Sequence, residues 1–169
     1  ISLPRLIICT ILTGGLYTLY WGFKNWDIYQ KATNDDDVVP YFRAMFFNWT
    51  AVSLFSKIND ITETGKSYMF YGLACLLIFA AEITICHSVM TEILDKDMVL
   101  RYGIILFLLM LIYPFFLVPV QISINKYTTE ILKKPLEKEF YPWEIIISVL
   151  GIVMNLFVWG VFLDAYARF

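Results

Sequence analysis

Histidine and cysteine are scarce in this chain, and their scarcity excludes several kinds of site. The 169 residues include one histidine, His87, and three cysteines, all within apolar segments and without a CxxC pair. An odd number of cysteines at such positions does not make a disulfide framework. Thiols in apolar segments behave as small apolar side chains. We therefore predict no metal site and no cofactor.

Catalytic motifs are also missing. The sequence contains no Walker loop, no GxGxxG, no HExxH and no GxSxG. A Ser–His–Asp relay would have to use His87, and no serine or acidic residue is recognisably placed for it. The net charge is −2 and the basic residues form no single patch, so nucleic acid is not an expected partner. We predict that the protein is not an enzyme.

Apolar residues dominate the composition. They make up 59% of the chain, with 18% aromatic residues, whereas a soluble domain is about 45–50% apolar. The excess lies in long uninterrupted runs, which is typical of an integral membrane protein. The length suits one all-α membrane bundle over residues 1–169. The chain begins at Ile1 and not at Met, so we expect further sequence upstream of it.

Four segments are long and apolar enough to be transmembrane helices. They cover approximately residues 3–25, 67–90, 99–122 and 143–163. The first has no small-residue cleavage pattern, so we interpret it as a retained helix and not as a signal peptide. In the third, Pro114 and Pro119 each remove a backbone donor, which predicts a kinked or locally opened helix.

Residues 38–61 separate polar and aromatic side chains at helical spacing. The polar stripe comprises Arg43, Thr50, Ser53, Lys57 and Asp60, and Trp49 falls on the apolar side. This pattern predicts one amphipathic helix lying in the membrane interface. The alternative is a fifth span, because little besides Arg43 interrupts residues 38–56.

The basic residues indicate the topology. With four spans, nine of the 13 Lys and Arg residues fall on one side: Lys24, Lys31, Arg43, Lys57, Lys66, Lys126, Lys133, Lys134 and Lys138. The positive-inside rule places that side in the cytoplasm. Both termini are then expected on the non-cytoplasmic side. Five spans would divide the charges more evenly.

Several aromatic motifs carry a family resemblance. They are LYWGFKNW after the first apolar run, PYFRAMFFNWTAVSLFSKI, VQISINKY, and LGIVMNLFVWG near the end of the chain. Together they resemble a family of small multi-pass membrane proteins of bacteria whose function is unknown. The resemblance implies a location in the bacterial inner membrane and adds no mechanism.

Glu82 is the leading candidate for a functional residue, because it lies inside an apolar span. A charged side chain at the bilayer centre costs roughly 2.5–3.5 kcal/mol on insertion scales, so Glu82 needs a partner or a task. The functional interpretation is a carboxylate that responds to protons or ions. The structural interpretation is a protonated acid hydrogen-bonded across a helix interface. Asn155 is a candidate partner if the two helices pack side by side.

Three further polar residues are weaker candidates. His87 follows Glu82 by five positions, about 140° around the helix, so the two do not share a face. It is either an interface residue or a pH-responsive switch. Gln121 and Asn125 lie where the third span leaves the membrane. They either line a polar vestibule or cap the helix end.

Two functions are compatible with these features. The first is a non-enzymatic membrane protein that acts through partners, as an accessory subunit of a membrane complex or by self-association. Its close-contact sites would be Gly14, Gly15, Gly72, Gly103, Gly151 and Gly160. The alternative is a small transporter, channel or lipid-binding protein that uses Glu82, although no inverted repeat is visible. The expected partners are membrane lipids, together with other subunits or further copies of the chain.

Overall fold

Helices form all the regular structure of the part of the chain described by the computed structural model, which is residues 1–62, 67–91, 95–136 and 139–167. In order they are α1 (Leu3–Leu12), α2 (Tyr17–Thr33), α3 (Pro40–Met45), α4 (Phe47–Thr62), α5 (Met69–Met90), α6 (Lys96–Lys126), the short π-helix η1 (Tyr127–Ile131) and α7 (Pro142–Ala167). The predicted all-α class is confirmed.

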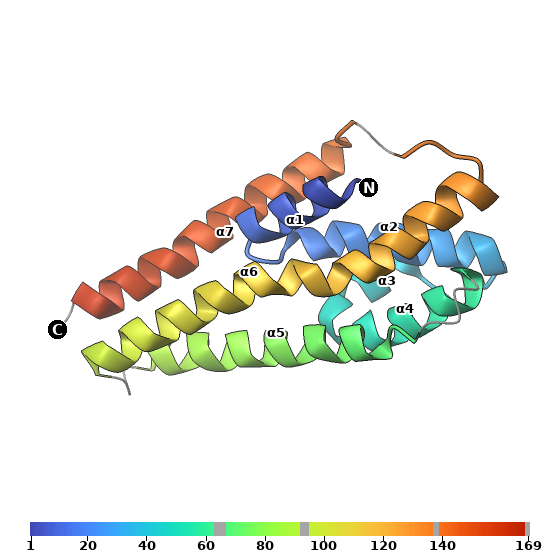
Figure 1. Cartoon of the computed structure of the whole chain (residues 1–169). Helices are drawn as coiled ribbons and strands as arrows, with labels where there is room; N and C mark the ends of the chain where they lie inside the picture. The colour runs from blue at the N-terminus through green and yellow to red at the C-terminus, as the bar shows by residue number, and fades with distance from the viewer. Residues whose placement is uncertain (63–66, 92–94, 137–138, 168–169) are drawn as a thin grey trace.

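Three of these helices are long and apolar enough to cross a membrane, namely α5, α6 extended by η1, and α7. α6 runs antiparallel to both α5 and α7 (Figure 1). Tyr68, just before α5, hydrogen-bonds Ser123 near the end of α6. The ammonium group of Lys96, at the start of α6, lies 4.6 Å from the ring centroid of Tyr166, near the end of α7. The expected fourth span is not confirmed.

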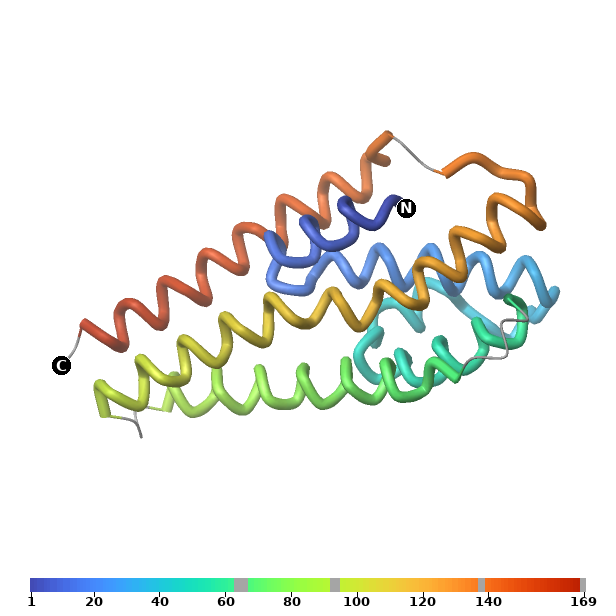
Figure 2. Tube along the Cα trace, viewed as in Figure 1, coloured from blue at the N-terminus to red at the C-terminus, as the bar shows by residue number. Residues whose placement is uncertain are grey.

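The helix predicted over residues 3–25 is not continuous. Gly14 and Gly15 have φ angles of +57° and +89°, left-handed conformations that glycine adopts without steric cost. The chain reverses there, so α1 and α2 form a helical hairpin (Figure 2). The 10 residues of α1 extend only about 15 Å, against a hydrocarbon core about 30 Å thick. The Gly-Gly pair therefore ends a helix instead of kinking a span.

The predicted interfacial helix is divided into α3 and α4, and two residues of its polar stripe, Arg43 and Lys57, contact α2. The guanidinium carbon of Arg43 lies 4.6 Å from the ring centroid of Trp26. Lys57 Nζ donates to the Tyr29 hydroxyl at 3.3 Å. Trp49, on the opposite face, is 68% exposed. An amphipathic helix lying on the membrane surface is not confirmed, because these contacts hold Arg43 and Lys57 against protein.

The larger core lies at the end of the molecule where α6 ends and α7 begins. There α1, α2 and α4 pack around the second half of α6, and the largest buried side chains are aromatic: Tyr17, Trp21, Trp26, Phe47 and Phe55. The ring of Trp21 meets those of Phe47 and Phe55 edge-on, with centroids 5.5 and 5.9 Å apart. The opposite end has a smaller cluster, built from α5, α6 and α7.

The long helix α6 continues through both of its prolines. Pro114 and Pro119 lie inside it without interrupting it. Each still lacks the N–H that would bond the carbonyl four residues earlier, at Met110 and Phe115 respectively. The predicted local opening does not break the helix.

Candidate functional site

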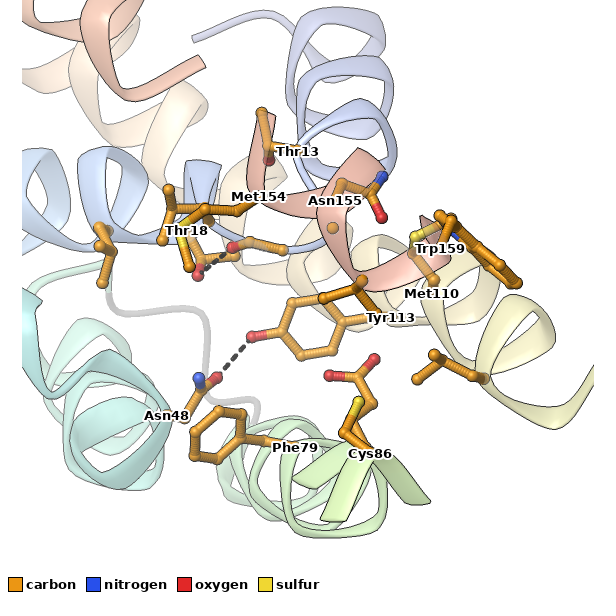
Figure 3. Close-up of a pocket in the computed structure, with 17 residues that line it drawn as sticks. Thr13, Thr18, Asn48, Phe79, Cys86, Met110, Tyr113, Met154, Asn155 and Trp159 are labelled. Atoms are coloured by element: carbon orange, nitrogen blue, oxygen red, sulfur yellow. Dashed lines mark hydrogen bonds between the residues drawn. The ribbon is translucent and has the colours of Figure 1, made fainter. Parts of the chain in front are cut away.

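A cavity of about 220 Å³ lies where the turn of the α1–α2 hairpin meets α5, α6 and α7 (Figure 3). Gly14 and Gly15 line it from the hairpin, and Glu82, Tyr113 and Asn155 line it from the three long helices. These three side chains lie about two turns or more from either end of their helices. The cavity is therefore deep within the part of the molecule that would cross the membrane.

The Glu82 side chain has no partner within the described residues. It lines the cavity and is half-buried, and neither a hydrogen bond nor an ion pair joins it to any residue of the four described ranges. The carboxylate-to-amide contact with Asn155 predicted from the sequence is not observed. Because an isolated charge at this depth is costly, the carboxyl group must be neutral or must bind something that enters the cavity.

Asn155 does bond across helices, but to the backbone of α1. Its Nδ2 donates to the Leu12 carbonyl oxygen at 3.1 Å. The last carbonyls of a helix have no partner within the helix, and this bond supplies a donor to one of them. Asn155 therefore completes the broken end of α1 and holds the hairpin turn on α7.

Two more polar contacts border the cavity, and the sequence analysis missed both. The Tyr113 hydroxyl donates to Asn48 Oδ1 at 2.8 Å (Figure 3). The Thr18 hydroxyl donates to the Gly15 carbonyl oxygen at 2.7 Å. Tyrosine in an apolar run has no distinctive signal, and Asn48 lies in the segment predicted to be an interfacial helix. Met110 also lines the cavity. Its carbonyl oxygen lacks the usual helical donor, because Pro114, four residues later, has no backbone N–H.

The remaining predicted residues lie elsewhere. His87 is exposed near the end of α5 and does not line this cavity. Gln121 and Asn125 border a second, polar cavity. Gln121 Nε2 donates to Asn125 Oδ1 at 2.6 Å, and the Gln121 oxygen accepts from the indole of Trp21. The structure therefore does not bring these amides together with Glu82.

A buried ion pair joins α1 to the start of α7. Arg5 Nε donates to Glu144 Oε1 at 2.7 Å, and Arg5 Nη2 binds the other carboxylate oxygen. The Tyr17 hydroxyl donates to Glu144 Oε1 at 2.5 Å. Glu144 is fully buried, and the guanidinium carbon of Arg5 lies 4.0 Å from the ring centroid of Phe140. This cluster anchors both arms of the hairpin to α7.

Comparison of the chain with protein-family models, curated proteins and solved structures finds no match. The family resemblance of the aromatic motifs stays a prediction. Across the described residues, no group of three or more His, Cys, Asp and Glu side chains is placed to hold a metal ion. The function is therefore argued from the cavity itself.

Proposed function

We propose that this protein is a small membrane transporter or channel, in which Glu82 binds a proton or a small cation half-way across the membrane. The observation that carries the proposal is the Glu82 carboxyl group, which lines a mid-depth cavity without a partner in the described residues. Ionisable residues inside membranes mark ion and proton pathways. The paired Arg5 and Glu144, in contrast, have the contacts expected of a structural pair.

The broken helix beside Glu82 supports the same function. Transporters commonly bind ions where a helix is interrupted, because the interruption presents backbone groups to the site. Gly14 and Gly15 line the cavity here, and the amide side chains of Asn48 and Asn155 add further oxygen atoms. Oxygen ligands suit hard cations. The cavity volume of about 220 Å³ leaves room for a small cation together with water, since a single water needs only about 10–15 Å³ of such volume.

The close-contact glycines argue against assembly as the main function. A Cβ atom at Gly72 would lie 2.7 Å from Val52 Cα, and one at Gly151 would lie 2.4 Å from Thr13 Cβ. These glycines therefore serve packing within the chain. At Gly160 no atom of another described helix lies within 4 Å of such a Cβ, and this open face on α7 favours a second proposal, an accessory subunit or homo-oligomer.

We further propose a bacterial inner-membrane location with the N-terminus in the cytoplasm and the C-terminus outside. If the α1–α2 hairpin enters and leaves the membrane on the same side, that side of the membrane carries ten of the 13 basic residues: Arg5, Lys24, Lys31, Arg43, Lys57, Lys66, Lys126, Lys133, Lys134 and Lys138. This asymmetry exceeds that of the four-span topology. This proposal differs from the expectation of both termini outside. It is supported by the contact of Arg5 with the start of α7, from which α7 leads to the opposite end of the molecule.

Flux measurements in liposomes test the proposed function. We expect the reconstituted protein to dissipate a proton, Na⁺ or K⁺ gradient, and Glu82→Gln to abolish that flux, because an amide of the same shape neither releases a proton nor binds a cation as strongly. Glu130→Gln is the matched control, because Glu130 is an exposed carboxylate outside the cavity, with Oε2 3.9 Å from Lys126 Nζ. Wild-type vesicles no leakier than empty ones, or full flux in a folded Glu82→Gln variant, would contradict the proposal.

A further inference from the structure

Two cavities at the end of the molecule where α7 begins share Lys24 and Tyr141. One, of about 470 Å³, is polar and lies between α2, the end of α6 and the chain after η1. The other, of about 340 Å³, is an apolar groove between α2, α3 and α7. We propose that the two together bind one anionic phospholipid, with its headgroup phosphate in the polar cavity and an acyl chain in the groove.

The polar cavity has the charge that an anionic headgroup requires. Lys24, Lys31 and Lys134 line it among the described residues, and Asp27 is the acidic side chain there. Asp27 Oδ2 accepts from Lys31 Nζ at 2.7 Å, so the acidic side chain of the described lining is already paired with a lysine. Basic pockets between membrane helices bind anionic headgroups. The amide side chain of Gln121 also lines this cavity.

The groove is built from apolar and aromatic side chains. The rings of Phe23 and Tyr41 form one wall and pack edge to face, with centroids 5.2 Å apart. Trp143, on the facing helix, is 66% exposed. Lys24 Nζ lies 4.4 Å from the ring centroid of Tyr141, at the junction of the two cavities. Aromatic rings prefer the boundary between headgroups and acyl chains, which is the depth this junction requires.

The order of residues along two helices matches the direction of a lipid in a bilayer. Of these two cavities, Leu19 on α2 lines the groove but not the polar cavity, Lys24 lines both, and Ala32 lines only the polar one. On the other side, Tyr141 lines both cavities and Ile147 only the groove, about 9 Å further along the chain at 1.5 Å per residue. The apolar part therefore lies deeper than the polar part, in the leaflet where α7 begins.

Native mass spectrometry of the purified chain in mild detergent tests the headgroup site. We expect one phosphatidylglycerol molecule to be retained in preference to phosphatidylcholine. The double variant Lys24→Gln/Lys134→Gln should weaken that binding at least about tenfold, because each lysine near an anionic headgroup contributes to affinity. Lys126→Gln/Lys96→Gln, which removes two lysines outside both cavities, should bind as the wild type does. Equal retention of the two lipids would overturn the proposal.

A groove-filling variant tests the acyl-chain site without changing charge. Ile147→Trp should block the groove and lower retention of phosphatidylglycerol, whereas Ile146→Trp, at an exposed neighbouring position outside the groove, should not. Unchanged retention in a folded Ile147→Trp variant, or competition by inorganic phosphate as effective as by lipid, would also overturn the proposal. None of these variants changes a residue that lines the Glu82 cavity. The lipid proposal and the ion-flux proposal can therefore be contradicted separately.

Discussion

At the residue scale, the Arg5–Glu144 pair shows how charges are tolerated in this apolar molecule. Both side chains are buried, and Tyr17 completes the hydrogen bonds of the carboxylate. We expect Arg5→Leu to lower the free energy of unfolding by about 3–5 kcal/mol, because it leaves Glu144 buried and unpaired. The double variant Arg5→Leu/Glu144→Leu should recover much of that loss, since it leaves no uncompensated charge.

Thermal and denaturant unfolding of the purified variants would measure these differences. A single Arg5→Leu variant as stable as the wild type would mean that the pair does not anchor the hairpin. A double variant less stable than the single one would mean that Glu144 has partners more important than Arg5.

The sequence revealed individual site residues only where their chemistry contrasts with their surroundings. Glu82 stands out as a carboxylate in an apolar span, and the structure places it in a cavity. Glu144 lies just after an expected helix start, where an acidic residue is ordinary. Its contact with Arg5 bridges 139 positions, and no periodicity or motif links residues at that separation. Local sequence patterns therefore could not predict the ion pair.

At the element scale, the hairpin depends on the close approach of α1 to α7 at Gly151. A Cβ atom there would lie 2.4 Å from Thr13 Cβ. We expect Gly151→Ala to lower the free energy of unfolding by about 1–3 kcal/mol through overpacking. Gly160→Ala is the matched control on the same helix. It should leave stability unchanged or raise it by up to about 1 kcal/mol, because alanine favours helix more than glycine does.

Denaturant unfolding monitored by circular dichroism would compare the two glycine variants. Equal stability of Gly151→Ala and Gly160→Ala would show that α1 does not pack against α7 as described. Flux and unfolding measured on the same Gly151→Ala preparation would also show whether the seating of the hairpin matters to the cavity.

Elements were predictable where one long apolar run makes one helix. The segments expected at residues 67–90, 99–122 and 143–163 correspond to α5, α6 and α7, because only a helix can keep so long an apolar run bonded in a membrane. The first run has the same apolar character but forms α1 and part of α2. Composition does not distinguish a single span from a hairpin, and the Gly-Gly pair fits either a kink or a reversal.

At the scale of the whole molecule, the two ends differ in construction. One end gathers α1–α4 around a core of aromatic side chains, and Lys24, Lys31 and Lys134 line a cavity at that end. At the other end α5, α6 and α7 expose apolar side chains such as Leu77, Ile104 and Leu156, which suits contact with lipid. The cavity with Glu82 lies between these two regions. Its mid-membrane position depends on whether the hairpin turns back inside the bilayer.

Cysteine labelling tests that hairpin most directly. Single cysteines at Ser2, Asp36 and Asp164, in a chain with Cys9, Cys75 and Cys86 replaced by alanine, would be treated with a membrane-impermeant maleimide on sealed vesicles of known orientation. The structure predicts that Ser2 and Asp36 react from one side and Asp164 from the other. If Ser2 and Asp164 react from the same side, opposite Asp36, the first segment crosses the membrane and the mid-membrane hairpin is wrong.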